Sequence, residues 1–167
     1  MELTWMGRNR ALVKQLTRHS NIVNRALNNA STFSNEVEMN CVELQILESL
    51  IEHEDENKIM SEIANDIGIP RSAMTLSSKH LLKQGLIERF KIEGNNKNII
   101  IRPTSYGRKI YQQYMETTGP ELFSAFFEEL DNFSEAELSK ITKALQTLNE
   151  SLCHDSTEKL IKFEEKK

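Results

Sequence analysis

The sequence predicts a mainly α-helical chain with one small β-hairpin, an α+β fold in which helices dominate. Apolar residues recur at steps of three and four over most of the 167 residues, which is the period of an amphipathic helix. Only two neighbouring stretches, LIERFKI and NIIIRP, show the β-branched alternation that is typical of strands. The chain is long enough for one compact domain, or for a small domain carried on extended helices.

The amino-terminal part is predicted to contain two helices. The first covers residues 4–29, where apolar residues lie among polar ones at steps of mostly three, four or seven. The stretch STFSNEVEMN is predicted to be a polar connector. A second helix is expected after Asn40, because Asn40 suits an N-cap and Glu43 follows three residues later, which is the spacing of a capping box.

The most specific pattern follows this second helix. A short helix, SEIANDI, ends at Gly68, whose missing Cβ suits the left-handed conformation of a helix end. Pro70 suits the first turn of another helix, which is expected to run to about Gln84 and to stop at Gly85. Two short helices joined by a tight turn are typical of a helix-turn-helix, although helical bundles also contain such pairs. The strand pair that follows, with EGNN as its turn, makes the pattern that of a winged helix-turn-helix.

The carboxyl-terminal part is predicted to be helical and rich in apolar residues. Thr104 is expected to cap a helix that Gly119-Pro120 interrupts or ends, and Ser134 with Glu137 forms a capping box for a last helix. The terminal helices are too apolar to be left uncovered. We therefore expect dimerisation contacts, with an intrachain core as the alternative. These contacts are predicted at Leu12, Leu16, Phe123, Phe126, Phe127, Leu138, Ile141, Leu145, Leu148 and Leu152.

The distribution of charge is more informative than the net charge of −4, which alone argues against nucleic acid. Residues 35–57 carry eight acids and no base, whereas residues 58–110 have a net charge of +6. A locally basic segment can attract phosphates because salt screens the distant acids; a solvated lysine-rich surface is the alternative. The amino terminus lacks the apolar segment of a secretory signal, and no apolar run could cross a bilayer. We expect a cytoplasmic protein with no membrane contact.

The sequence motifs do not predict an enzyme, a metal site or a cofactor. HExxH, GxxxxGK[ST], GxSxG and GxGxxG are absent, and the four histidines lack metal-ligand spacing. The run from His53 to Glu56 could hold a divalent ion, but a solvated acidic turn is the simpler interpretation. Cys41 is expected near a helix amino terminus, where it could be a redox-sensing or a structural thiol. It forms no CxxC pair with Cys153.

Four segments occur in a specific order and spacing: ELQILESLIEH, SEIANDIGIPRSAMT, LLKQGLIER and RPTSYGRKIY. They resemble the MarR family of bacterial regulators, which has a leucine-rich second helix and an L-A-x-x-L-G-[VI]-x-x-S-x-[VT]-T turn and recognition helix. In that family, the recognition helix is followed by the pattern L-x-x-x-G-L-[VI]-x-R, and the fifth helix begins with the pattern L-T-x-x-G. The chain departs from this pattern in its wing, where GNNKN replaces an Asp-x-Arg motif. Leu76 and Ser77 stand at positions that are more often basic and apolar, respectively.

The resemblance implies a homodimeric transcriptional regulator, expected to be a repressor, that binds double-stranded DNA at a pseudo-palindromic operator. It also implies a small-molecule effector in a cleft beside the DNA-binding domain. On this basis residues 1–34 and 111–167 form the dimerisation helices, and residues 35–110 form the winged helix-turn-helix. The alternative is an adaptor or antirepressor that binds proteins instead of DNA. DNA contacts are expected from Arg71, Ser72, Thr75, Ser78, Lys79 and Lys83 of the recognition helix and from Lys91, Asn95, Asn96 and Lys97 of the wing.

Overall fold

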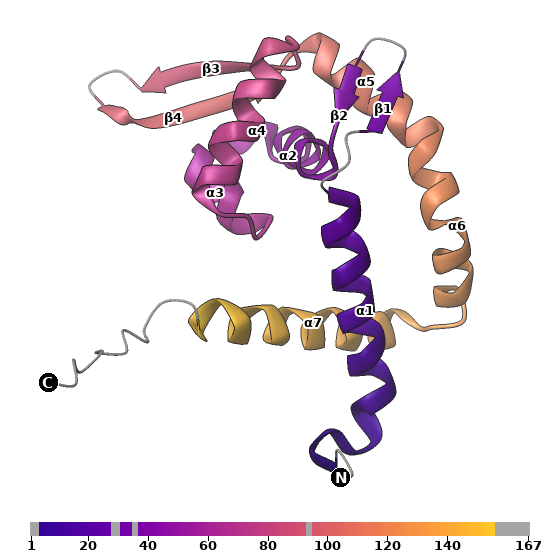
Figure 1. Cartoon of the computed structure of the whole chain (residues 1–167). Coiled ribbons are helices and arrows are strands. Elements are labelled where there is room, and N and C mark those ends of the chain that lie inside the picture. Colours follow the sequence, from indigo (N-terminus) through magenta and orange to yellow (C-terminus); the bar gives the residue numbers. More distant parts are fainter. Residues whose placement is uncertain (1–3, 28–30, 35–36, 93–94, 156–167) are drawn as a thin grey trace, which may run out of the picture. The chain divides into compact units, whose positions relative to one another are not determined.

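The computed structural model describes residues 4–27, 31–34, 37–92 and 95–155 (Figure 1). The chain divides into two compact units, residues 1–119 and 120–167. In chain order, the elements are a 3-10 segment η1 (Thr4–Asn9), α1 (Arg10–Leu27), β1 (Ser31–Ser34), β2 (Val37–Met39), α2 (Cys41–Glu52), a 3-10 turn η2 (Glu54–Glu56), α3 (Met60–Asp66), α4 (Arg71–Lys83), β3 (Ile87–Ile92), β4 (Asn95–Pro103), α5 (Ser105–Glu116), α6 (Thr118–Leu130) and α7 (Glu135–Asp155). The predicted α+β class is confirmed, because helices predominate and β3 and β4 form an antiparallel hairpin.

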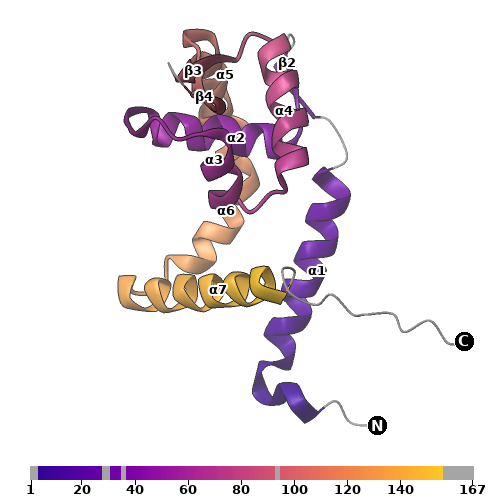
Figure 2. The same cartoon turned by 90° about the vertical axis from the view of Figure 1, so that its left-hand side faces the viewer.

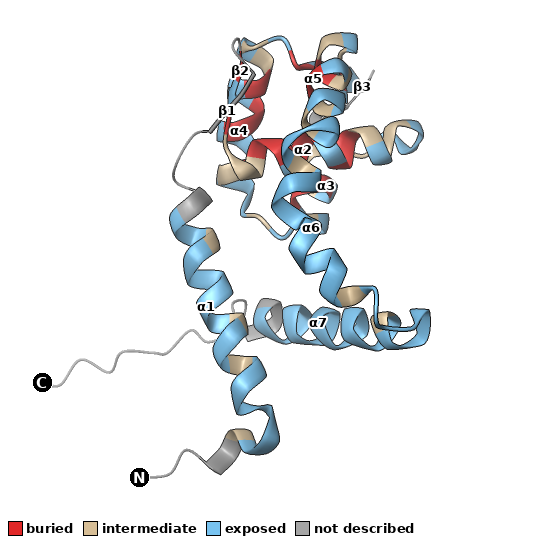
Figure 3. Ribbon diagram, turned by 90° about the vertical axis from the view of Figure 1, so that its right-hand side faces the viewer, coloured by how far each residue is buried: buried red, intermediate tan, exposed pale blue. Residues whose placement is uncertain are grey.

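The hydrophobic core of the first unit is built around α2. Asn40 caps this helix as predicted, since its Oδ1 accepts a hydrogen bond from Glu43 N at 2.9 Å and Glu43 Oε2 accepts one from Asn40 N at 3.0 Å. Ile46 and Leu47 on α2 are completely buried, together with Leu81 on α4. Each such side chain stabilises the fold by about 1.5–3 kcal/mol relative to an exposed one. Figure 3 shows that the buried residues concentrate in this part of the chain, whereas α1, α6 and α7 are largely exposed.

The helix-turn-helix forms as predicted. Gly68 and Gly85 adopt positive φ values of 73° and 72°, which close α3 and α4 respectively. After Gly68 the chain turns back, and Ile69 N donates a hydrogen bond to Ala64 O at 2.9 Å. Pro70 is the N-cap residue of α4 and directly precedes its first turn. The two glycines therefore lie just before and just after α4 and fix where this helix begins and ends.

The hairpin that follows projects from the helices in Figure 1 and has an irregular outer end. Pairing runs regularly until Lys91 lies opposite Ile99, and then the register shifts so that Ile92 lies opposite Asn95. The predicted EGNN turn is therefore too long, because Asn95 and Asn96 belong to β4. Toward the base, Ile59 forms a β-bridge with Ile100, which ties β4 to the chain just before α3.

Thr104 joins the hairpin to α5 and confirms the predicted cap. Its Oγ1 accepts a hydrogen bond from Gly107 N at 2.9 Å and donates one to Gly85 O at 2.7 Å. The same residue's N–H donates to Leu86 O at 3.0 Å. A Cβ on Gly107 would lie 2.1 Å from Leu86 O, so this close approach of α5 to the exit from α4 requires a glycine.

Two predictions for the amino-terminal part are wrong. The first helix is not continuous from residue 4, because Gly7 has a φ of 50° within η1 and the α-helix begins only at Arg10. The expected polar connector instead contains strands β1 and β2, which pair antiparallel. Val37 and Met39 of β2 are buried in the core, since alternate residues of a strand point to the same face.

The carboxyl-terminal helices bury little within one chain. Gly119-Pro120 lies in the first turn of α6, after α5 has ended at Glu116. Ser134 and Glu137 interact at the start of α7, where Glu137 Oε2 accepts hydrogen bonds from Ser134 N at 2.9 Å and from Ser134 Oγ at 2.7 Å. The rings of Phe123 and Phe127 stack with centroids 5.7 Å apart, yet both side chains remain exposed. No helix in the described ranges is both long and apolar enough to span a membrane.

Candidate nucleic-acid interface

Helix α4 presents one polar, basic face to solvent and buries the opposite face. Met74 and Leu81 point into the core and are 1% and 0% exposed. The solvent face follows from the helical period, since residues three or four apart lie on one side. Its exposed members are Arg71, Ser72, Thr75, Leu76, Lys79 and Lys83. Five of the six residues predicted to contact DNA from this helix are therefore accessible.

The sixth prediction, Ser78, is wrong. Its side chain is buried, and its Oγ donates a hydrogen bond to Thr75 O at 3.3 Å within α4. Ser77 beside it is also buried. Ser78 lies between the buried residues Met74 and Leu81, at steps of four and three along the helix, so it belongs to the inward side of α4.

Two polar contacts fix α4, one against α2 and one against β2. His80 Nδ1 lies 2.8 Å from Glu43 Oε1, and Gln84 Nε2 donates a hydrogen bond to Glu38 O at 2.9 Å. Glu43 is buried, but its second oxygen accepts the capping bond from Asn40 N, so the carboxylate is satisfied. Figure 2 shows α4 crossing α2 near the end where these residues lie. These contacts fix the position of α4, and its solvent-exposed face remains accessible.

The basic residues of segment 58–110 fall into two groups. Lys58 pairs with Asp66 at 2.9 Å, a hydrogen bond that raises the pKa of the lysine, and Arg108 pairs with Glu54. These bases are neutralised within the fold. In contrast, the cations Arg71, Lys79, Lys83, Arg89 and Lys91 form no ion pair with any acid in the described part of the chain. Helix α4 and strand β3 thus carry five cations that the described acids do not neutralise.

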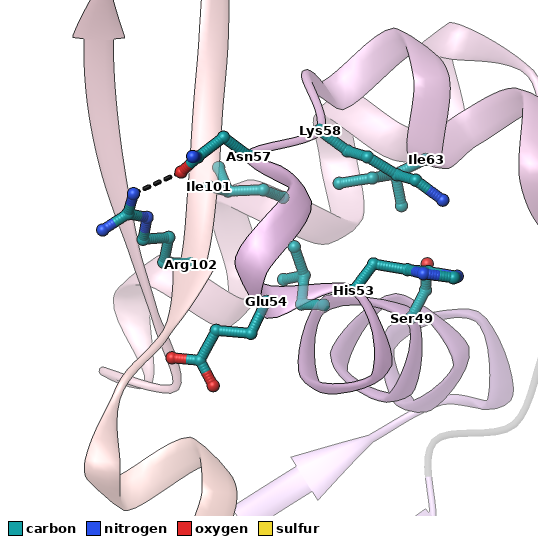
Figure 4. Close-up of a pocket in the computed structure, with 9 residues that line it drawn as sticks. Ser49, His53, Glu54, Asn57, Lys58, Ile63, Ile101 and Arg102 are labelled. Atoms are coloured by element: carbon teal, nitrogen blue, oxygen red, sulfur yellow. Dashed lines mark hydrogen bonds between the residues drawn. The ribbon is translucent and has the colours of Figure 1, made fainter.

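The base of the hairpin carries an arginine contact that no sequence motif indicates. The guanidinium of Arg102 donates a hydrogen bond to Asn57 Oδ1 and lies 5.4 Å from the centroid of the Phe90 ring. Asn57 has a positive φ of 51°. Its side chain and Arg102 line a small pocket, which Figure 4 shows with Glu54 and Lys58. This contact links the wing strand β4 to the chain between α2 and α3.

The wing contributes one described member of the predicted contact set. Lys91 is exposed on β3. The side chains of Asn95, Asn96 and Lys97 lie outside the described residues, so their roles stay predictions. An open cleft is lined by Arg71 and Thr75 of α4, by residues 59–61 at the start of α3 and by Ile99 of β4. Helix α4 and strand β4 therefore both border this cleft.

The histidine and cysteine candidates lie at the two ends of α2. Among the described residues, no group of three or more His, Cys, Asp or Glu side chains is arranged to hold a metal ion. His53 instead forms a hydrogen bond with Glu56, with Nδ1 and Oε1 3.1 Å apart.

Cys41 is a free, half-buried thiol at the first position of α2. Where α2 meets α5, the hydroxyl of Tyr111 donates a hydrogen bond to Glu48 Oε1 at 2.7 Å, and burial raises the pKa of this tyrosine.

An exposed basic helix in a helix-turn-helix, followed by a hairpin, defines the class of winged-helix DNA-binding proteins. Residues 39–99 match the model of the MarR family. The chain is 25% identical over 123 residues to the HTH-type transcriptional regulator PchR of Bacillus subtilis (strain 168), a match that covers 74% of the chain and 71% of that relative. The residues that match the family model extend from the end of β2 into β4, and the relative is a transcriptional regulator.

Solved structures share the fold at low sequence identity. A mutant of MarR from E. coli, complexed with operator DNA, superposes with a TM-score of 0.57 at 15% identity, over 89% of this chain and 99% of that MarR chain. The PcaV transcriptional regulator from Streptomyces coelicolor, in complex with its natural ligand, gives a TM-score of 0.60 at 12% identity, over 95% of this chain and 99% of PcaV. Both likenesses concern the fold alone.

Proposed function

We propose that this chain is a MarR-family regulator that binds double-stranded DNA sequence-specifically as a homodimer and represses transcription from a pseudo-palindromic operator. The observation that carries this proposal is the outer face of α4, which is exposed along its length and whose cations lack acidic partners among the described residues. A helix of this kind fits the major groove, which is wide enough to admit an α-helix. The likeness to a regulator solved with operator DNA supports the same assignment.

The positions along α4 suggest separate tasks for its residues. Arg71 is at the amino-terminal end of the helix, the part that approaches base edges in helix-turn-helix proteins, and its guanidinium can contact guanine O6 and N7 together. Ser72, Thr75 and Lys79 follow on the same face and can contact bases or phosphates. Lys83 at the carboxyl-terminal end is better placed for a backbone phosphate. Lys91, Asn95, Asn96 and Lys97 of the wing would contact the adjacent minor groove.

Dimerisation would place two such helices about one helical turn of DNA (~34 Å) apart, as two half-sites require. The support is the exposure of apolar side chains on the terminal helices: Leu12 on α1 is 64% exposed, and Phe126 on α6 is 57% exposed. Leu16 and Leu138 are partly covered, whereas Phe123, Phe127, Ile141, Leu145, Leu148 and Leu152 are exposed within one chain. Light scattering should therefore give a mass near twice 19.3 kDa, and a monomer at micromolar concentration would contradict the dimer.

An effector that lowers DNA affinity is the regulatory part of the proposal. The likeness to a regulator solved with its natural ligand supports it, and the region where α1, α2 and α5 meet is the expected location. Coupling between effector and DNA would be about 1–3 kcal/mol. Compounds that raise the melting temperature should also weaken DNA binding. If stabilising compounds never change DNA affinity, the regulatory part is wrong.

The test of DNA binding begins with duplexes selected from a random pool by the purified chain. Arg71→Ala should cost about 1–3 kcal/mol and relax the preference at one base position per half-site. Lys83→Ala and Lys97→Ala should weaken binding to all sequences and reduce the salt slope by about one unit for each phosphate that is no longer neutralised. Lys140→Ala on α7 is the control, because it removes an exposed cation from the other unit of the chain.

Two results separate DNA binding from the protein-binding alternative. If the folded dimer binds no duplex in a salt-dependent manner, the assignment fails and an adaptor or antirepressor becomes the better interpretation. The same holds if Arg71→Ala and Lys97→Ala both leave DNA affinity and its salt dependence unchanged. None of these side chains lies in the described core, so the melting temperature of each variant should remain close to that of the wild type.

A further inference from the structure

Leu76 is more exposed than any other large apolar side chain in the described ranges, at 72%. It lies in the middle of α4, four residues after Ser72 and three before Lys79, and both of these residues are exposed on the same face. A leucine in this position adds nothing to the core, whose α4 members are on the opposite face of the helix. Its exposure leaves the side chain available for a contact outside the chain.

The surroundings of Leu76 distinguish it from the other exposed apolar residues. Leu12, Leu122 and Leu152 lie on α1, α6 and α7, whose apolar faces suit a second copy of the chain. Leu76 instead shares its helix face with Lys79 and Lys83, which pair with no described acid. An isolated apolar group among cations does not complement the hydrophobic face of a protein helix. An apolar group between cations suits DNA, whose phosphates are negatively charged and whose major groove contains the thymine methyl group.

We propose that Leu76 reads the C5-methyl group of a thymine in the major groove, one in each half-site. This inference rests on the proposed DNA-binding function and assigns part of its sequence preference. The thymine methyl is the apolar group that the base edges present in the major groove. A leucine forms no hydrogen bond, so it distinguishes a thymine from the other bases by burial of that methyl group alone. The preferred half-site therefore contains a thymine opposite the middle of α4.

Thr75 is the neighbouring residue that could make the same contact. Its Oγ1 donates a hydrogen bond to Arg71 O at 2.8 Å, so the hydroxyl proton is used within the helix and the γ-methyl remains available. Thr75 is one residue before Leu76 and is also exposed. The experiment must therefore separate these two side chains.

Replacing thymine by deoxyuridine removes only the methyl group and tests the proposal directly. Using the full chain and a duplex selected from a random pool, each thymine is replaced in turn and the Kd is measured at one salt concentration. The wild type should lose affinity about fourfold at one thymine per half-site, the effect of about 0.8 kcal/mol for one buried methyl-sized group. In Leu76→Ala this penalty should disappear. Leu76→Met, which keeps an apolar side chain of similar size, and Thr75→Ser should both retain it.

The outcomes are distinct from a failure of DNA binding. If the wild type binds duplex DNA but no uracil substitution weakens binding, or if Leu76→Ala keeps the full penalty, this inference is wrong and the proposed function stands. If Thr75→Ser removes the penalty instead, the methyl group is read by Thr75 and the assignment to Leu76 is overturned. If no duplex binds at all, the proposed function and this inference fail together, and Leu76 belongs to a protein-binding surface.

Discussion

The winged helix and the terminal helices carry similar apolar residues but place them in different environments. Leu47 and Leu81 in the winged helix are 0% exposed, whereas Leu122 on α6 is 68% exposed and Leu152 on α7 is 65% exposed. Both regions have amphipathic patterns, so the pattern alone does not distinguish them. The difference lies in what the chain itself provides: the apolar residues of α2 belong to a buried core, and those of α7 do not.

This contrast separates two sources of stability. The winged helix has its own buried core and satisfied helix ends, and we expect it to contribute most of the free energy of unfolding of a single chain. The terminal helices expose apolar area that becomes useful only when another surface covers it. Mutations in the first region should therefore affect folding, and mutations in the second should affect association.

The largest expected effect is on association. Leu145→Glu combined with Leu148→Glu places carboxylates in the proposed seam of α7, where the two leucines are 41% and 42% exposed in one chain. An uncompensated buried charge costs about 3–5 kcal/mol, so the double variant should be a monomer by light scattering at micromolar concentration. DNA affinity should fall with the loss of the dimer.

Thr147→Glu is the matched control for this experiment. It adds one carboxylate to the same helix, where the double variant adds two, but residue 147 is about 100° of helical rotation before Leu148 and lies away from the seam. This variant should remain a dimer. If it also becomes a monomer, general charge repulsion explains the effect, and the seam has not been located.

The second expected effect is on the winged helix. Gly107→Ala would place a Cβ 2.1 Å from Leu86 O, which forces the backbone to shift, and overpacking of this kind costs about 1–3 kcal/mol. Without the close contact, alanine would stabilise the helix relative to glycine by up to about 1 kcal/mol. Urea unfolding should thus show destabilisation for Gly107→Ala and little change for Gln113→Ala, an exposed control on α5. Stabilisation by Gly107→Ala would contradict the close approach.

The sequence predicts those parts of the winged helix that depend on local chemistry. The capping box of Asn40 and Glu43, the left-handed glycines 68 and 85, and the cap at Thr104 are all in the structure as predicted. Each of these features depends on residues within a few positions of one another. Local signals of this kind are read directly from the sequence.

The features that the sequence did not reveal depend on long-range packing. A strand as short as Val37–Met39 shows too little alternation to be recognised, and its burial depends on the core that α2 provides. The hydrogen bond of Arg102 with Asn57 joins residues 45 positions apart. Helices α2 and α3 pack against α4, and this packing decides which of its side chains are buried. The buried Ser78 and the exposed Leu76 are therefore distinguished by the structure and not by the sequence.

A smaller effect is expected at the start of α2. Asn40→Ala removes the acceptor for Glu43 N and should lower the free energy of unfolding by about 1 kcal/mol. Asn40→Ser, which keeps a side-chain oxygen able to cap, should recover most of this loss. Urea unfolding of the three proteins measures both values. If the Ser and Ala variants are equally destabilised, the loss comes from packing and not from the cap.

The smallest effect should appear in the pH dependence of the winged helix. The hydrogen bond from Arg108 holds the pKa of Glu54 below its usual value, because the guanidinium favours the charged carboxylate. A depressed pKa in the folded state means that the pair stabilises the fold above the unfolded-state pKa, about 4.3 for a glutamate, and that this contribution is lost as the pH falls through the folded-state pKa. Glu54→Gln should therefore be less stable than the wild type at neutral pH, and the difference should shrink in acid. Asp55→Asn removes an equal charge from the same turn without touching Arg108, and its difference from the wild type should not follow this course. If the Glu54→Gln difference stays constant from neutral pH down to well below the glutamate pKa, the ion pair does not stabilise the link between η2 and α5.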